Sequence, residues 1–136
     1  MIPPPIAIRV LVVDDHVDCA ESLAQLLCVA GYDVRTAYGG LQAIEMAEAW
    51  HPGVVLLDIG LPDLDGHEVG RRLRSTEWGS GALLIGVSGW DADQQPGPPG
   101  SAGFDHRMVK PIDLDALVQL LPAPPAASTD RLVRAA

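Results

Sequence analysis

Four short apolar runs of the sequence each end in residues whose side chains could take part in phosphate or metal chemistry. Asp14 and Asp15 follow the run IRVLVV, and Asp58 closes the run VVLLD. Ser88 ends the run ALLIGVS, and Lys110 ends the shorter run MVK. Lys110 is the only lysine among nine basic residues, and a slim ammonium differs chemically from the planar guanidinium of arginine. We therefore treat these five residues as candidates for one site.

If the five residues meet, three carboxylates lie close together and repel one another. A hard divalent cation removes this conflict, because Mg²⁺ prefers oxygen ligands and is often bound through one or two carboxylates and phosphate oxygens. We expect Mg²⁺, with Mn²⁺ as an alternative. A phosphoryl group would then find two cations for its oxygens, a hydroxyl for a hydrogen bond and a carboxylate that attacks in line. The product is an acyl phosphate, a labile bond suited to a reversible signal.

The elements that must position these residues alternate between apolar strands and amphipathic helices. The expected strands cover residues 8–13, 33–38, 54–58, 82–88 and 108–110, and the expected helices cover 18–30, 41–50, 67–75 and 113–121. Strands that are apolar throughout are typical of a parallel sheet covered on both faces. The pattern predicts an α/β, doubly wound fold, in which ligands bind at the carboxyl ends of the strands.

Local signals set the expected helix ends and the domain limits. Asp18 and Glu21 have the spacing of a capping box with Asp18 as N-cap, and Gly31 marks the end of that helix. Residues 91–104, DADQQPGPPGSAGF, stand where the fourth helix belongs, and their three prolines and three glycines allow at most a short turn. We expect one domain over 8–121, a disordered or extended tail at 1–7 and a flexible tail rich in Pro and Ala at 122–136.

Bulk properties exclude several classes of protein. A hydrophobic fraction of 48% excludes a mainly disordered chain, and a net charge of −9 disfavours nucleic-acid binding. No apolar run approaches the roughly 20 residues of a membrane span, and the first residues lack a charged segment typical of a signal peptide, so we expect a cytoplasmic protein. Cys19 and Cys28 fall in one expected helix, too far apart for a disulfide, and we expect two reduced, packed cysteines.

The motifs VLVVDDH, VVLLDIGLPDLDG, GVSG and GFDHRMVKP, taken together and in this order, resemble those of response-regulator receiver domains of two-component signalling. The resemblance covers about residues 8–121. It implies a flavodoxin-like, five-stranded parallel sheet of order 2-1-3-4-5, with the fourth helix short or missing in this chain. The last motif is similar to the variant found in receivers attached to hybrid histidine kinases.

The resemblance also assigns the metal ligands and the phosphoacceptor. Asp58 corresponds to the phosphoacceptor and to one of the metal-binding carboxylates. Asp15 corresponds to a direct Mg²⁺ ligand, and Asp14 to a residue that acts through water or positions its neighbour. The backbone carbonyl of Gly60 completes the ligands that the protein contributes.

Two further residues are expected to contact the phosphoryl group. Ser88 corresponds to the switch hydroxyl, and Lys110 to the phosphate-contacting lysine, with a cis peptide bond before Pro111. The phosphoryl donor implied is a phosphohistidine on a histidine kinase or a phosphotransfer protein. The downstream target is not implied by the sequence, and we expect neither nucleic acid nor a membrane as partner.

The chain departs from the family pattern at two places. An aromatic residue is usual three positions before the lysine, and Arg107 stands there instead. The stretch 91–104 replaces a helix that belongs to the family's usual output face. We therefore expect the phosphorylation chemistry to be intact and the readout of the signal to be altered.

Other readings of the same residues are a non-switching interaction module of receiver fold and an aspartyl-phosphate hydrolase. The hydrolase normally has a second Asp two positions after the first, where this chain has Gly60, so we expect no enzyme beyond self-phosphorylation and weak autodephosphorylation. A flavin-binding protein shares the fold, but no strand is followed by a phosphate loop rich in Ser, Thr and Gly. We interpret His16 as a helix-start residue, His106 as structural, and Asp63 and Asp65 as turn residues.

Overall fold

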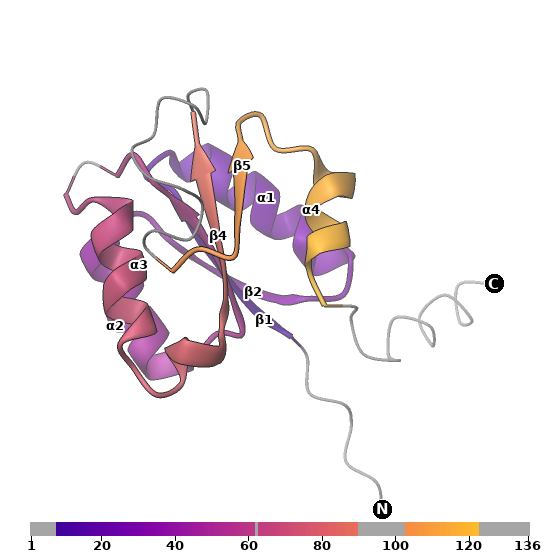
Figure 1. Ribbon diagram of the computed structural model, residues 1–136. Helices are drawn as coiled ribbons and strands as arrows, with labels where there is room; N and C mark the ends of the chain where they lie inside the picture. Colours follow the sequence, from indigo (N-terminus) through magenta and orange to yellow (C-terminus); the bar gives the residue numbers. More distant parts are fainter. Residues whose placement is uncertain (1–7, 62, 90–102, 123–136) are drawn as a thin grey trace, which may run out of the picture.

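The computed structural model describes residues 8–61, 63–89 and 103–122 (Figure 1). Within these residues the strands are β1 (Arg9–Val13), β2 (Asp33–Ala37), β3 (Val54–Asp58), β4 (Leu83–Ser88) and β5 (His106–Val109). The helices are α1 (Val17–Val29), α2 (Gly40–Trp50), α3 (Gly66–Arg74) and α4 (Leu114–Leu120), with a 3₁₀ turn, η1 (Gly79–Gly81), before β4.

The five strands form one parallel sheet of order β2-β1-β3-β4-β5, which confirms the predicted doubly wound fold. β3 is buried along its whole length, as its unbroken apolar sequence predicts. The register pairs Val13 with Leu57, Asp58 with Val87, and Ser88 with Val109. The carboxyl ends of β1, β3, β4 and β5 therefore lie along one rim of the sheet.

Helices cover both faces of the sheet, with α2 and α3 on one side and α1 and α4 on the other (Figure 1). Because successive side chains of a strand point to opposite faces, β1 contributes to two cores. Leu11 and Val13 belong to the core under α2 and α3. Val10 and Val12 belong to the core under α1 and α4. A sheet buried on both faces holds the strand ends, and hence the site, in fixed positions.

The start of α1 differs from the prediction. Asp18 lies in the first turn, and the N-cap residue is His16, whose side chain makes no capping hydrogen bond. The predicted capping box is therefore wrong, because the chain already turns into the helix at the acidic pair, where Asp14 Oδ1 accepts from the N–H of His16 at 3.0 Å. The predicted end is confirmed: Gly31 follows the helix with φ of 110°, a conformation that favours glycine.

Other predictions were only partly correct or fall outside the described residues. β5 begins at His106, two residues earlier than expected. Cys19 and Cys28 are both free, but both are exposed, so the expectation that they pack in the core is wrong. The tails at 1–7 and 123–136 and most of the stretch 91–104 lie outside the described residues. Among the described helices, none has the length and apolarity to cross a membrane.

Candidate functional site

The strand ends bring the predicted site residues together in a cleft. Three polar side chains at this rim are buried: Asp14 is 8% exposed, Asp58 6% and Ser88 5%. Asp58, Ser88 and Lys110 line a cleft of about 570 Å³, together with Asp15 and with the loop that follows β3. The structure therefore places these rim residues close together, and their shared chemistry stays a prediction.

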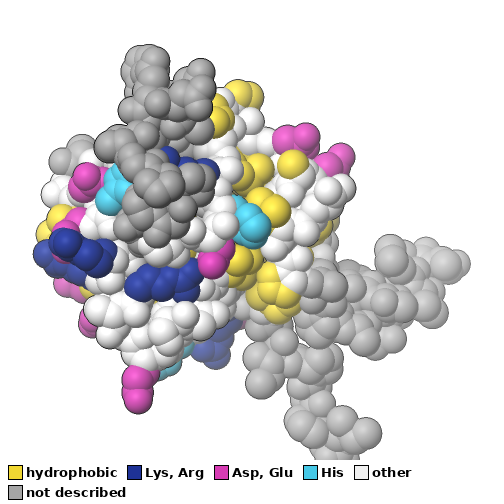
Figure 2. All heavy atoms as spheres, in the orientation of Figure 1, with side chains coloured by type: hydrophobic (Ala, Val, Ile, Leu, Met, Phe, Trp, Pro, Cys, Tyr) yellow, Lys and Arg dark blue, Asp and Glu magenta, His cyan; other side chains and the backbone are white. Residues whose placement is uncertain are grey.

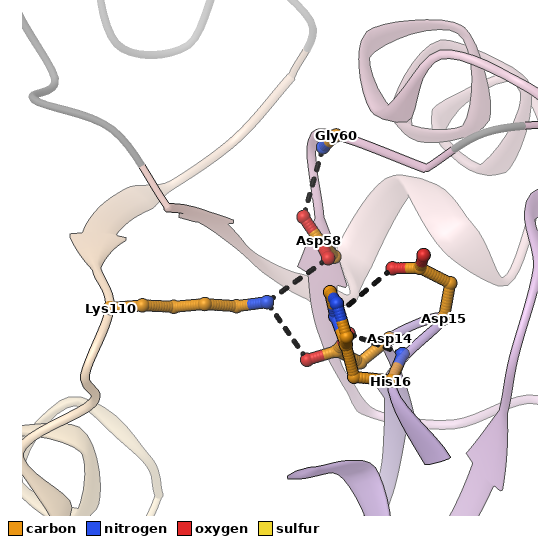
Figure 3. Close-up of polar contacts among 6 residues, drawn as sticks. All are labelled: Asp14, Asp15, His16, Asp58, Gly60 and Lys110. Carbon is orange, nitrogen blue, oxygen red and sulfur yellow. Dashed lines mark hydrogen bonds and ion pairs between the residues drawn. The ribbon is translucent and has the colours of Figure 1, made fainter.

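Lys110 is the cation of this cleft, and it reaches across from the end of β5 toward two carboxylates (Figure 3). Its Nζ lies 3.0 Å from Asp14 Oδ2 and 3.1 Å from Asp58 Oδ2. Partial burial acts to lower the pKa of Lys110, but the hydrogen bonds to the two carboxylates outweigh it and raise the pKa above its usual range. The ammonium is therefore charged at neutral pH and serves as a counter-ion for both acids.

The acidic side chains are held by backbone donors as well as by the lysine. Asp58 Oδ1 accepts from the N–H of Gly60 at 2.9 Å. Burial acts to raise the pKa of Asp14, but the N–H of His16 and the ammonium of Lys110 outweigh it, so this pKa is lowered. The His16 ring lies against the same cluster, with Nδ1 at 3.2 Å from Asp14 Oδ1 and 3.5 Å from Asp15 Oδ1.

The donor atoms at this rim suit a hard divalent cation. One ligand atom from each of Asp14, Asp15, His16 and Asp58 can be chosen such that all lie within 4.8 Å of one another. Octahedral Mg²⁺ has ligands at about 2.1 Å, so opposite ligand atoms lie roughly 4.2 Å apart. The carboxylates thus fit the ion with small movements. Gly60 lines the same cleft, which places its backbone beside the acids.

The loop after β3 is fixed by carboxylates that the sequence predicted as turn residues. Asp63 accepts from the N–H groups of Gly40 and Leu41 at 2.9 and 3.2 Å, and so caps α2 from a distant part of the chain. Asp65 is the N-cap of α3 and accepts from the N–H of His67 at 2.9 Å. Neither carboxylate belongs to the acidic cluster described above.

Gly66 allows the loop to fold back on the end of β3. A Cβ atom at this position would lie 2.6 Å from the Ile59 Cα and 2.8 Å from the Asp58 carbonyl oxygen. Both distances are shorter than real Cβ contacts, so only glycine permits this approach. The Asp-Gly pair therefore starts α3 directly against the end of β3.

The segment after β5 positions the lysine. The Lys110–Pro111 peptide bond is cis, as the resemblance predicted. The N–H of Lys110 donates to the carbonyl of Ser88 at 2.8 Å, which continues the pairing of β4 with β5 past the end of the strand. The backbone of Lys110 is thus tied to the residue whose hydroxyl lines the same cleft.

Arg107 occupies the position where the family pattern has an aromatic ring, and it contacts a residue that the sequence did not single out. One Nη atom of Arg107 lies 2.8 Å from Nε2 of His67, which lines the cleft from the first turn of α3. The one available signal was a histidine immediately after the Asp-Gly turn, and it gives no indication of a partner 40 residues away.

An apolar groove adjoins the site on the α1 side. It has a volume of about 490 Å³ and is lined by Cys19, Ser22, Leu23 and Leu26 of α1 and by Pro111 and Ile112 after β5, while Asp14 and Lys110 belong to both the groove and the site. Figure 2 shows hydrophobic side chains gathered on the face of the molecule where α1 and α4 lie. Leu26 is half exposed there.

Comparisons with known proteins agree on one family. Residues 10–122 match the family model described as the response regulator receiver domain. The response regulator MprA of Mycobacterium ulcerans is 37% identical over 112 residues, which cover 82% of this chain and 47% of that protein. This chain thus spans about half the length of that curated relative.

Solved structures give the same answer. A CheY-like receiver domain protein from Methanospirillum hungatei superimposes with a TM-score of 0.78 at 27% identity, covering 85% of this chain and 90% of that one. The receiver domain of a sensor histidine kinase from Pseudomonas aeruginosa, solved with a magnesium ion in its active-site cleft, gives a TM-score of 0.76 at 25% identity, with coverages of 85% and 94%. The chain therefore belongs to the response-regulator receiver domains of two-component signalling.

Proposed function

We propose that this receiver accepts a phosphoryl group on Asp58 in a reaction that depends on Mg²⁺. The observation that carries the proposal is the double ion pair of Lys110, which joins Asp58 to Asp14 in one buried cluster. A lone carboxylate at the end of an apolar strand needs no such arrangement. A phosphoacceptor does, because charge must be neutralised on both sides of the transferred group.

The proposed metal site consists of Asp14, Asp15, Asp58 and the carbonyl of Gly60. When bound there, Mg²⁺, or Mn²⁺ in its place, would supply positive charge opposite the lysine and draw the phosphoryl oxygens toward the acidic cluster. Asp15, the more exposed of the acidic pair, is suited to direct coordination. Asp14 is buried and already holds the N–H of His16 and the ammonium, which suits it to position its neighbours.

The transfer itself is a displacement at phosphorus. A carboxylate oxygen of Asp58 forms the new P–O bond while the P–N bond to the donor imidazole breaks, and the donor nitrogen keeps the electron pair. The ammonium of Lys110 exchanges its contact with the Asp58 carboxylate for the phosphoryl oxygens. Ser88, buried at the end of β4 and lining the same cleft as Asp58, donates a hydrogen bond from its hydroxyl to one of these oxygens.

The donor in this proposal is a phosphohistidine on a histidine kinase or a phosphotransfer protein. Such a protein needs a surface beside Asp58, and the groove along α1 is apolar and continuous with the site through Asp14 and Lys110. We propose that the donor protein packs there.

The hydrolase alternative is not favoured by the site. Gly60 offers no side chain at the position where a general acid or base would be needed, and Asp14 and Asp15 are engaged with Lys110 and His16. We therefore propose slow loss of the phosphoryl group to water rather than enzymatic turnover. The alternative of a non-switching interaction module depends on the role of Arg107, and the Arg107→Gln variant distinguishes it from our proposal.

The test uses acetyl phosphate, a small donor that needs no docking surface. Incubation with acetyl phosphate and Mg²⁺ is expected to add the mass of one phosphoryl group to the intact protein, with the modified peptide containing Asp58. The Asp58→Asn variant should remain unmodified. Asp33→Asn, which removes an exposed carboxylate at the start of β2, is the matched control and should be modified like the wild type.

The adduct should also require the metal. Addition of EDTA in excess over Mg²⁺ is expected to abolish it while the circular dichroism spectrum shows the protein still folded. A folded wild-type protein that gains no mass with Mg²⁺ present, or an adduct that persists in Asp58→Asn, would contradict the proposal.

A further inference from the structure

His67 lies in the phosphoacceptor cleft, but the chemistry described so far gives it no task. It lines the cleft with Asp58 and Lys110, and its side chain is 23% exposed. Its ring meets Phe104 edge-on, with 5.9 Å between the centroids. Nδ1 lies 3.1 Å from Asp65 Oδ1, and Nε2 lies 2.8 Å from an Nη atom of Arg107. Both ring nitrogens are therefore engaged.

These two contacts fix the position of the proton on the ring. A guanidinium can only donate, so Nε2 of His67 must accept from Arg107. A carboxylate can only accept, so Nδ1 must donate to Asp65. Both contacts require the same neutral ring with its single proton on Nδ1. A second proton, on Nε2, would point at the guanidinium, so the doubly protonated ring and the Arg107 contact exclude each other.

The guanidinium of Arg107 is incompletely hydrogen-bonded among the residues that the structure describes. Its Nε is buried and has no hydrogen-bond partner among the residues that the structure describes. Its guanidinium carbon lies 5.9 Å from the centre of the Phe104 ring. Among the described residues its acceptor is His67, a neutral imidazole in this contact, which binds a cation more weakly than a carboxylate does. The contact can therefore be broken by any change that places a proton on Nε2.

We propose that His67 contacts the phosphoryl group, and that Arg107 is a positioning residue that keeps the ring neutral until Asp58 is phosphorylated. The inference rests on the proposed function of Asp58. Phosphorylation replaces the single negative charge of the Asp58 carboxylate with nearly two on the phosphoryl group, which brings the charge into the cleft that the ring lines, and such charge favours an imidazolium. His67 takes up one proton from solvent, Nε2 becomes a donor, and Arg107 is released.

The charged groups that surround the ring are consistent with this exchange. Asp65 at the N-terminus of α3 holds the Nδ1 proton in both states. Arg107 on β5 opposes the second proton, and across the cleft Lys110 is already paired with Asp58. The phosphoryl group is thus the added negative charge that favours the doubly protonated ring over the contact with Arg107. Arg107, which stands where the family pattern has an aromatic residue, then transmits the phosphorylation state beyond the site.

The first test is nitrogen NMR of the wild-type protein, which avoids any question of folding in variants. In the free protein, the His67 ring should show the neutral form protonated at Nδ1, and the Arg107 side-chain N–H groups should exchange slowly. Binding of beryllofluoride with Mg²⁺, a mimic of the phosphoryl group, should protonate both ring nitrogens and speed exchange at Arg107. A neutral ring and a protected Arg107 in the loaded protein would overturn the inference.

A double-mutant cycle then tests whether the two residues act as a unit. Arg107→Gln keeps a donor for the neutral ring, but its amide oxygen can also accept from the protonated ring. We expect it to raise the affinity for beryllofluoride about fivefold. His67→Phe keeps the packing on Phe104 and removes both nitrogens, so it should lower that affinity by a similar factor. In the His67→Phe background, Arg107→Gln should then have no effect.

Arg71→Gln makes the same change at an exposed arginine of α3 and should leave the affinity unchanged. If Arg107→Gln raises the affinity equally with and without His67, Arg107 does not act through the ring and the inference fails. Mass spectrometry after acetyl phosphate treatment separates the two proposals. An adduct on Asp58 without a change in the protonation state of the His67 ring overturns the inference alone. The absence of an adduct overturns the proposed function as well.

Discussion

At the scale of single residues, the most informative contact is the one between Lys110 and the two buried acids. In the resting protein the ammonium occupies the place next to Asp14 and Asp58 that a divalent cation would also neutralise. Lysine and metal therefore compete for the same negative charge, although they need not share a position. The lysine should make the resting site a weaker binder of Mg²⁺ than its carboxylates alone would be.

This competition is testable with one substitution. Lys110→Met keeps most of the length of the side chain and removes the charge, so we expect Mg²⁺ to bind roughly five- to tenfold more tightly, because a partly buried ion pair at about 3 Å is no longer broken. Isothermal titration of the unphosphorylated protein measures this directly.

The matched control is Lys110→Arg, which keeps the charge. It should leave the Mg²⁺ affinity close to that of the wild type, yet impair the response of a downstream partner, since the broad guanidinium cannot replace the slim ammonium beside the phosphoryl group. Equal Mg²⁺ affinity in Lys110→Met and wild type would argue against competition.

The rim residues could be found from the sequence because each one ends an apolar strand. Parallel strands bring their carboxyl ends together, so Asp58 and Ser88 could be placed in one site without knowledge of any side-chain contact. His67 could not be found in this way. Its importance comes from a contact between α3 and β5, and the direction of a helical side chain depends on how the helix packs rather than on local sequence.

At the scale of elements, Arg74 at the end of α3 connects three parts of the chain. Its guanidinium donates to the carbonyls of Gly103 and Ala82 at 2.8 and 2.5 Å and pairs with Asp105 at 2.6 Å. Asp105 in turn accepts from the N–H of Leu84 at 2.9 Å. One side chain thus joins the end of α3, the entry to β4 and the segment before β5.

We expect Arg74→Met to destabilise the fold by about 2–4 kcal/mol, because buried carbonyls lose a charged donor and the described segment before β5 loses its anchor. Urea unfolding followed by circular dichroism measures the loss. Arg72→Met, at an exposed position of the same helix, is the control and should change stability little. A similar loss in both variants would show that the network of Arg74 contributes nothing specific.

Element types were predictable and some element ends were not. The periodicity of apolar residues predicted the five strands and the four helices that the structure describes. The start of α1 was misplaced because Asp18 and Glu21 satisfy the local rule for a cap, while Asp14 at the end of β1 binds the first backbone N–H. Asp14 and Asp18 thus compete for the start of the helix, and the position at which β1 ends decides between them. A short sequence motif does not contain this information.

At the scale of the whole molecule, several carboxylates link stability to pH. Backbone N–H groups of Gly40 and Leu41 lower the pKa of Asp63, and the N–H of His67 lowers that of Asp65. A lowered pKa in the folded state stabilises the fold above the unfolded value, near 3.8, and this contribution is lost as the pH falls through the lower folded value.

The contribution of these carboxylates to the free energy of unfolding should therefore be nearly constant from neutral pH down to about pH 5 and fall steeply below about pH 4. Urea unfolding at a series of pH values measures this curve. Asp63→Asn, which keeps the shape and removes the charge, should lower the midpoint of unfolding at neutral pH and make the acid limb less steep. An unchanged acid limb in that variant would mean that the cap on α2 is not a source of the pH dependence.

The ion pairs of Lys110 also have a consequence for how the molecule responds to its surroundings. A metal ion that arrives alone draws the acids away from the ammonium and leaves a half-buried cation without a partner. A phosphoryl group that arrives alone meets three acids and one cation. Only the two together satisfy every charge, so each should bind more tightly in the presence of the other. On the proposed function, the cleft therefore responds fully only when a divalent cation and a phosphoryl group are present together.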